Sequence, residues 1–254
     1  HFRGESGEEV VRGEIPAELR GLAAERRAEM IDTLSLHSDE LLEAALDDRV
    51  TPELIHAAIR RGVLSLELTP VLIGSAYKNK GVQPLLDAVT LYLPSPAEVP
   101  VEAVDLDADN APVALTPDPT AAQPVAFAFK LEDGRFGQLT YLRVYQGTLV
   151  KGGTVVQTRT GRKLRLGRIV RLHADTMEDV TEARAGDIVG LFGVDCRTGD
   201  TFAGEGRRLA MTSMHVPDPV MSLSVEPADA KAEVNMSKAL ARFAKEDPTF
   251  RVTL

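Results

Sequence analysis

Hydrophobic positions recur at three- to four-residue spacing over residues 15–61, which predicts helices rather than strands. Pro16 suits the first turn of one helix, because proline tolerates that position. Ser38 is a good N-cap for a second helix, and Thr51 stands just before the Pro-Glu pair that is typical of a third helix start. We therefore expect a helical region here.

The period changes at residues 68–73, LTPVLI, a short apolar run that is typical of a strand buried on both faces. The loop GSAYKNKG (74–81) follows, and the spacing of apolar residues then predicts a helix over 82–92. The predicted inner face of that helix carries Leu85, Leu86, Val89 and Leu93. Strand, loop and helix together form the unit that places ligand-binding loops at the carboxyl edge of an α/β sheet. One strand alone cannot make that sheet.

Residues 94–124 contain seven prolines, six acids and no Lys or Arg, which indicates a linker or a wrapping segment. Over residues 125–211, strand-sized runs are separated by glycine-rich turns, which predicts a small antiparallel barrel. The remaining residues predict a β-α-β unit, with strands at 217–227 and 249–254 and a helix over 228–244. The fold class predicted for the whole chain is multidomain α+β.

Composition narrows the class of protein. The chain of 254 residues is 44% hydrophobic and 26% charged, which is the balance of a globular protein. It contains no run of 18 apolar residues, so the sequence predicts no membrane-spanning helix. Cys196 is the only cysteine, so an intrachain disulfide is excluded and we expect a small core residue. The net charge of −9 argues against a chain that coats nucleic acid along its whole length.

The charge is unevenly distributed. Residues 150–172 hold seven basic side chains and no acid. One interpretation is a charged sheet edge that discourages the addition of another strand. The other is contact with RNA phosphates, for which the candidates are Arg162, Lys163, Arg165, Arg168 and Arg171. Both interpretations stay open from the residues alone.

The sequence lacks the machinery that binds nucleotide phosphates. A phosphate loop needs the pattern G-x-x-x-x-G-K-[ST], and the dipeptide Gly-Lys occurs nowhere in the chain. Asn79-Lys80 is similar to the guanine-reading N-K-x-D element, but Val82 stands where that element needs Asp. The five histidines have no metal-ligand spacing, so we expect no catalytic residue and no metal site.

Three sets of motifs carry a family resemblance. They are GSAYKNKGVQPLLDAVTLYLPSPAEVP, the pieces GQLTYLRVYQGTLVKGGTV and EARAGDIVGLFGVDCRTGDT, and KALARFAKEDPTFRV near the end. In this order, the chain strongly resembles translation elongation factor G over nearly its whole length.

The resemblance implies a division into five parts. They are the helical insert of a GTPase domain (1–67), the last strand, guanine-side loop and helix of that α/β domain (68–93), a proline-rich linker (94–124), a translation-factor barrel (125–214) and the start of a ferredoxin-like third domain (215–254). The family's phosphate loop and switch regions are expected to precede residue 1, and its fourth and fifth domains to follow residue 254.

The family hydrolyses GTP on the ribosome and drives the movement of transfer RNA and messenger RNA. The resemblance therefore implies GTP or GDP with Mg²⁺ as the ligands of the complete protein, with none expected for this chain alone. It also implies a cytoplasmic monomer that binds the ribosome and does not bind a membrane. Two alternatives stay open: a non-enzymatic module that binds ribosomal RNA, and a degenerate paralogue of translational GTPases.

The resemblance also implies particular contacts. Ser75 and Ala76 match the loop that lies against guanine, with Lys78 alongside. The family's barrel contacts small-subunit ribosomal RNA, which strengthens the RNA interpretation of the basic run. Its acidic helical insert docks the ribosomal stalk protein, and the candidates for that contact are Asp39, Glu40 and Glu43.

We predict that the 254-residue chain has no measurable affinity for GTP or GDP, because the groups that bind the phosphates supply most of the binding energy. Titration with a fluorescent GDP analogue checks this. A dissociation constant in the micromolar range or tighter, on the order of −8 kcal/mol, would contradict it.

Overall fold

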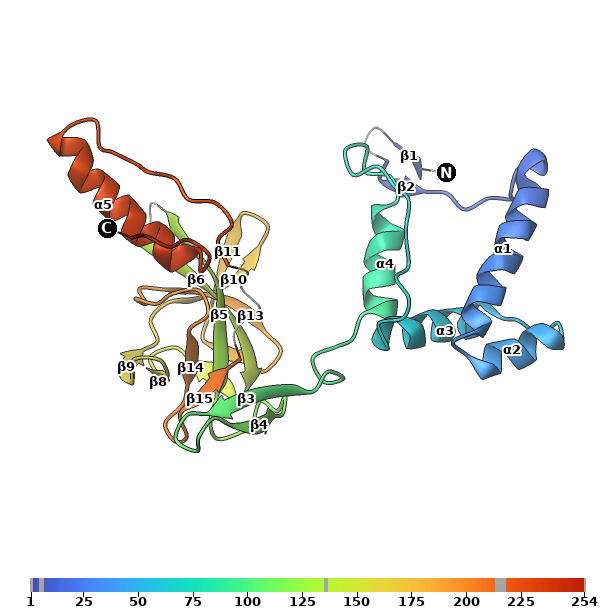
Figure 1. The fold of residues 1–254 in the computed structure, drawn as a ribbon. Coiled ribbons are helices and arrows are strands. Elements are labelled where there is room, and N and C mark those ends of the chain that lie inside the picture. Colours follow the sequence, from blue (N-terminus) through green and yellow to red (C-terminus); the bar gives the residue numbers. More distant parts are fainter. Residues whose placement is uncertain (1, 5–6, 135–136, 213–217, 254) are drawn as a thin grey trace. The chain divides into compact units, whose positions relative to one another are not determined.

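The computed structural model describes residues 2–4, 7–134, 137–212 and 218–253. The chain divides into two compact units, residues 1–95 and residues 96–254 (Figure 1).

The first unit is built mainly from helices. Their bounds are Arg20–Ser35 (α1, after the 3-10 turn Ala17–Leu19), Asp39–Leu46 (α2), Pro52–Leu64 (α3) and Val82–Tyr92 (α4). The amide of Leu41 donates to Oγ of Ser38 (3.3 Å), and the amide of Leu54 donates to Oγ1 of Thr51 (3.4 Å). These bonds satisfy amides that a helix start leaves without a partner, so the predicted cap at Ser38 is confirmed, and Thr51 caps the third predicted helix in the same way.

A small apolar cluster holds the first three helices together. Its buried members are Leu34 of α1, Leu41 of α2, and Ile55 and Ala58 of α3. A short hairpin of Phe2–Arg3 (β1) and Glu9–Val10 (β2) precedes them.

The strand predicted over residues 68–73 does not form in this chain. The segment has no strand geometry, and Val71 and Ile73 are 84% and 94% exposed. No backbone hydrogen bond joins residues 69–73 to another described segment. A strand exists only beside a neighbouring strand, and this unit offers none to it.

The predicted inner face of α4 is also wrong. Leu85, Leu86, Val89 and Leu93 are each 45% or more exposed, whereas the buried residues of this helix are Ala88 and Tyr92. The helix packs on α3 through its other side, where the hydroxyl of Tyr92 lies 2.6 Å from Nδ1 of His56. A row of leucines and a valine on α4 is therefore left uncovered by the described residues.

The second unit is dominated by an antiparallel sheet of eight strands. In pairing order they are Thr176–Val180 (β11), Ile169–His173 (β10), Ile188–Phe192 (β13), Gly137–Gln146 (β6), Val125–Gly134 (β5), Thr201–Ala203 (β14), Thr154–Gln157 (β8) and Arg162–Arg165 (β9). A separate two-stranded ladder joins Thr148–Val150 (β7) to Glu182–Arg184 (β12).

The predicted closed barrel is not confirmed. Among the described strands, β11 and β9 each pair with a single neighbour in this sheet, so the order does not return on itself. Both end strands present mostly exposed side chains, many of them charged. Charge on an end strand disfavours the addition of a further strand, which is a common way to protect an open edge.

The segment 94–124, for which the sequence predicts a linker or a wrapping segment, contains two strands. Val101–Asp105 (β3) pairs with Ala111–Leu115 (β4) and with Leu209–Met211 (β15). Pro112 is tolerated because β4 is the edge of this three-stranded sheet. Buried Ala103 and Leu115 pack beneath it with Val125 and Leu209, so the segment is part of the second unit's core.

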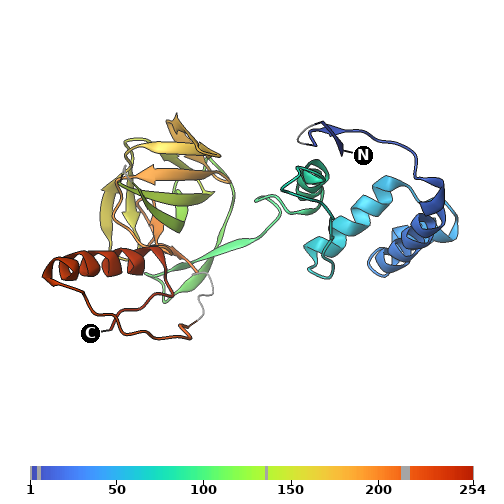
Figure 2. The same cartoon turned by 90° about the horizontal axis from the view of Figure 1, so that it is seen from above.

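Near the end of the chain, the predicted helix is confirmed as Ala230–Glu246 (α5), which lies beside the strands of the second unit (Figures 1 and 2). The two flanking strands are not: residues 218–227 and 249–253 have no strand geometry and no described strand partner. Residues 217 and 254, at the ends of those predictions, lie outside the described part.

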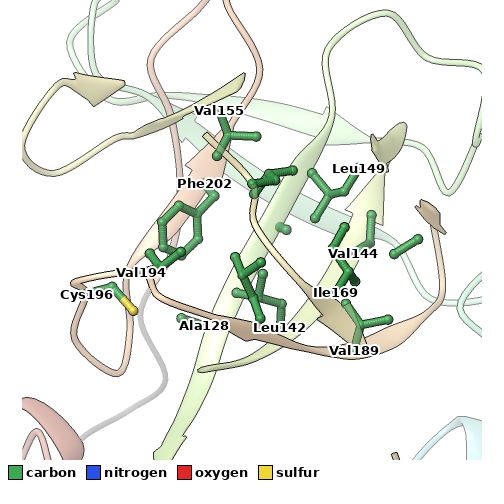
Figure 3. Packing of buried hydrophobic residues seen from close by; sticks show 14 of the residues in the cluster. Ala128, Leu142, Val144, Leu149, Val155, Ile169, Val189, Val194, Cys196 and Phe202 are labelled. Atoms are coloured by element: carbon green, nitrogen blue, oxygen red, sulfur yellow. The ribbon is translucent and has the colours of Figure 1, made fainter. Parts of the chain in front are cut away.

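The main core of the second unit lies between the strands of the eight-stranded sheet (Figure 3). Phe202, Leu142, Val144 and Val189 are 1% exposed or less. Cys196 is 2% exposed, and burial raises the pKa of its thiol to about 11. The prediction of a small core cysteine is confirmed.

A buried carboxylate organises the loop before β14. Asp200 is 3% exposed and accepts bonds from Arg159 Nε (2.6 Å) and Nη2 (3.0 Å), Gln157 Nε2 (2.6 Å) and the amide of Arg197 (2.8 Å). Burial alone would raise the pKa of Asp200, but the bonds from Arg159, Arg197 and Gln157 outweigh it and hold that pKa below its ordinary value of 3.8. A buried charge needs such complete pairing.

We predict that Asp200→Asn lowers the free energy of unfolding of the second unit by about 2 kcal/mol at pH 7, since it leaves Arg159 without its charge partner. A carboxylate with a lowered folded pKa stabilises above its unfolded pKa, and the effect fades as the pH falls through the folded value. Urea unfolding at pH 7 and at pH 3 should therefore show a smaller difference at pH 3.

The matched control is Asp179→Asn, which breaks an exposed pair with Arg168. We expect it to change the stability by less than about 0.5 kcal/mol. Equal effects of the two substitutions at pH 7 would contradict the structural role of Asp200.

Candidate functional site

The loop at residues 74–81 is closed by its own backbone. The amide of Ser75 donates to the carbonyl of Lys80 (2.8 Å), and the amide of Lys80 donates back to Ser75 (3.0 Å). Inside this bridge, the amides of Lys78 and Asn79 donate to the carbonyls of Ser75 (3.1 Å) and Ala76 (3.0 Å). These bonds hold the loop in shape without help from a sheet.

Two glycines make the closure possible. A Cβ on Gly74 would lie 2.7 Å from the carbonyl oxygen of Lys80, which is closer than packing allows. Gly81, the N-cap of α4, has φ +82° and lies against the backbone of Ile73 and Gly74. Any other residue at position 81 would be strained there.

The outer rim of the loop has unused donors. The amides of Ala76 and Tyr77 donate to no acceptor in the described part of the chain, and Tyr77 is 99% exposed. Lys78 is exposed and its side chain has no described partner. Two neighbouring amides and an ammonium group suit the carbonyl oxygen and the face of a flat heterocycle. Ser75, Ala76 and Lys78 thus lie together on one short loop.

A second contact supports this loop from behind. Gly7 is buried, and a Cβ on it would lie 2.7 Å from the carbonyl oxygen of Lys78 and 2.8 Å from that of Asn79. Gly7, which lies between β1 and β2 in the chain, therefore packs directly on the loop backbone. The sequence shows a glycine at position 7 but nothing that predicts this contact.

The five basic candidates do not form one free cationic surface. Arg162, Lys163 and Arg165 lie on β9 at one end of the eight-stranded sheet, whereas Arg171 lies on β10 next to the other end and Arg168 just precedes it.

Four of the five have a carboxylate within 4 Å. The pairs are Arg162–Asp195 (3.9 Å), Lys163–Glu205 (2.6 Å), Arg168–Asp179 (2.6 Å) and Arg171–Asp187 (3.9 Å). Arg165 instead donates to the carbonyl of Gly152 (3.2 Å). The acids come from residues 179–205, so a sequence window over the basic run could not reveal them.

The acidic candidates lie on the solvent side of α2. Asp39, Glu40 and Glu43 are exposed and have no described basic partner. Asp39 and Glu40 occupy the first turn, where negative charge favours the helix dipole, so helix stability accounts for both. Leu46 is 79% exposed on the same short helix.

A groove of about 800 Å³ lies in the first unit between α1, α3 and α4, and the segment 68–72 forms one wall. No residue of the 74–81 loop lines it, so groove and loop are separate features. Within the described residues, no three His, Cys, Asp or Glu side chains group as metal ligands. None of the described helices is long and apolar enough to cross a membrane.

Comparisons with known proteins place two domains along the chain. The model described as elongation factor Tu domain 2 matches residues 137–203, and the model described as elongation factor G, domain III matches residues 216–254.

Curated relatives match the whole chain. Elongation factor G 2 of Anaeromyxobacter dehalogenans and elongation factor G 1 of Syntrophus aciditrophicus are each 56% identical over 100% of the chain. The mitochondrial elongation factor G-1 of Arabidopsis thaliana is 51% identical over 100% of it. The chain spans only 36%, 36% and 34% of these proteins.

A solved structure is also similar. A crystal structure of a protein from Thermus thermophilus covers 95% of this chain with a TM-score of 0.69 and 25% identity, and the match spans 34% of that protein.

We predict that Gly81→Ala opens the 74–81 loop, at a cost of about 1–2 kcal/mol, because alanine is disfavoured at a positive φ. Amide hydrogen exchange at Ser75 and Lys80 measures it, and both amides should exchange about tenfold faster. Gly21→Ala in α1 is the control, since a Cβ there meets no other atom within 4 Å. Unchanged exchange at Ser75 and Lys80 in Gly81→Ala would contradict the proposed closure.

Proposed function

The chain belongs to the elongation factor G family, and from this premise we propose that the complete protein is a translational GTPase that promotes the movement of transfer RNA and messenger RNA through the ribosome. The observation that supports this best is identity of 50–56% to elongation factor G proteins over essentially the whole chain. We infer a cytoplasmic protein that works with GTP, GDP and Mg²⁺.

This chain contains only part of such a GTPase. It spans about a third of the length of its relatives, and it has no phosphate-loop sequence. GTP hydrolysis therefore depends on residues outside these 254. We propose that the chain alone binds no nucleotide and catalyses no hydrolysis.

Its contribution to the nucleotide site is one wall, which the 74–81 loop forms. Ser75 closes the loop, the amide of Ala76 points its hydrogen to the base oxygen of guanine, and Lys78 lies alongside. The support is the rigid backbone bridge together with the unused amides of Ala76 and Tyr77. The residues present fit the base, and none fits the phosphates.

Membership of this family also offers an explanation for the uncovered apolar surface of the first unit. We propose that residues 68–73 are the last strand of an α/β sheet whose other strands belong to the rest of the protein, with residues 1–67 as a helical insert. The exposed side chains of Val71 and Ile73, and of Leu85 and Leu86 on α4, are what such a sheet would cover.

In the second unit, residues 125–214 act as the translation-factor barrel and residues 215–254 as the start of a ferredoxin-like domain. Arg165 and its neighbours on β9 would contact small-subunit ribosomal RNA. Arg168 and Arg171, which are nearby in sequence, are further candidates for that contact. The ion pairs reduce the free charge of this surface. A module that binds RNA through these strands alone is therefore the weaker alternative.

The stalk protein of the ribosome would meet α2. Asp39, Glu40 and Glu43 carry negative charge without a described basic partner there, and exposed Leu46 adds an apolar contact. A basic, partly apolar partner segment fits this surface.

The test uses the complete reading frame that encodes this chain. We expect ribosomes to stimulate its GTP hydrolysis, and Ala76→Pro to weaken GDP binding about tenfold by removing one amide donor. Ala76→Gly keeps the donor and serves as the control. Hydrolysis that ribosomes do not stimulate would overturn the function, whereas equal GDP affinity of Ala76→Pro and Ala76→Gly would overturn only the assignment of the loop.

A further inference from the structure

A polar cavity of about 190 Å³ lies in the second unit beside the C-terminal end of α5. Its lining includes Gln157, Arg159, Thr160, Arg162, Asp195, Cys196, Arg197 and Lys245. A water molecule takes about 30 Å³ in the liquid, so the cavity has room for roughly six waters or for one small hydrated anion.

The cavity collects positive charge from four separate places in the fold. Arg159 follows β8, Arg162 begins β9, Arg197 lies before β14, and Lys245 lies in the last turn of α5. Two carboxylates, Asp195 and Asp200, pair with three of these cations: Asp200 with Arg159, and Asp195 with Arg162 and Lys245. The balance leaves a net positive charge of about two.

One of the cations is held rigidly. Asp200, buried beneath the cavity, binds Nε and Nη2 of Arg159, and this leaves Nη1 of Arg159 with no described acceptor. A fixed guanidinium loses little side-chain entropy when it binds a ligand. Asp200 also accepts the amide of Arg197, which fixes the backbone of the loop that carries the fourth cation.

The remaining charged groups of the cavity differ in how many partners they have. Asp195 accepts from Nζ of Lys245 at 2.6 Å and lies 3.9 Å from Nη1 of Arg162, and these neighbours lower its pKa. The side chain of Arg197 is exposed and has no described partner. Arg197 thus lines the cavity with a guanidinium group that has no acceptor among the described residues.

We propose that this cavity binds a phosphate group. Arginine presents a planar fork of donors that matches phosphate oxygens, and both Arg159 and Arg197 are among the residues that line the cavity. The surplus charge of about two suits a phosphate dianion. This site is separate from the guanine-side loop, which lies in the other unit, and it does not depend on the proposed GTPase activity.

Phosphate binding here would also stabilise the attachment of α5. The amide of Thr198 donates to the carbonyl of Lys245 (3.0 Å), and Oγ1 of Thr198 donates to the carbonyl of Glu246 (2.7 Å). These bonds cap the C-terminal end of α5 with the loop that lines the cavity. A bound anion that attracts Lys245 and Arg197 together would hold helix and loop in contact.

The experiment is a titration of the 254-residue chain with inorganic phosphate at low ionic strength and pH 7.5, by calorimetry and by amide chemical shifts. We expect shifts centred on residues 157–162, 195–198 and 245. Arg197→Gln should weaken binding about tenfold, since it removes a charge-assisted contact. Asp195→Asn should tighten it several-fold, because it removes a competing carboxylate from the cavity.

Lys151→Gln is the matched control, because the side chain of Lys151 is exposed, has no described partner and does not line the cavity. It should leave phosphate affinity within about twofold. Opposite effects of Arg197→Gln and Asp195→Asn cannot come from loss of folding, which would weaken both. Absence of phosphate binding, or equal weakening by Arg197→Gln and Lys151→Gln, would overturn the proposal.

Two further ligands distinguish the source of the phosphate. Tighter binding of uridine 5′-monophosphate than of the dinucleotide UpU supports a free phosphate monoester as ligand. Tighter binding of UpU supports a phosphodiester of an RNA chain in the same cavity. If either compound binds without shifting the amides of residues 157–162 and 195–198, the cavity is not the site and the proposal fails.

Discussion

The backbone N–H and C=O groups of a strand need hydrogen-bond partners on a neighbouring strand. This requirement determines which segments of the chain form strands. In the second unit, β3 pairs with β4 and also with β15, which lies about a hundred residues later, so even a proline-rich segment becomes part of a sheet. In the first unit, residues 68–73 form a short apolar run but have no strand partner in the described chain, and they stay irregular, with Val71 and Ile73 exposed. Hydrophobicity alone does not make a strand.

The 74–81 loop escapes this dependence, because its bonds are internal. Ser75 and Lys80 close it, Gly81 starts α4, and Gly7 packs behind it. The loop therefore keeps its shape without a sheet beside it. The same holds for the cavity beside α5, whose geometry rests on buried Asp200 and on the Thr198 cap.

The sequence predicted those features that depend on neighbours along the chain. The helices, their caps at Ser38 and Thr51, the buried Cys196 and the strands of the main sheet all follow from local periodicity and side-chain chemistry. It failed where a distant partner decides the outcome: the pairing of β3 with β15, the exposed face of α4, and the open ends of the sheet. The basic run looked free for the same reason, since its acidic partners lie elsewhere in the chain.

We propose that residues 68–73 form a strand only when the other strands of a sheet are present. The direct measurement is amide hydrogen exchange at Val71, Leu72 and Ile73 in the 254-residue chain and in the complete protein. In the 254-residue chain, we expect these amides to exchange almost as fast as in an unfolded peptide. In the complete protein, we expect strong protection, on the order of 10³-fold or more. Equal exchange of these amides in both proteins would contradict it.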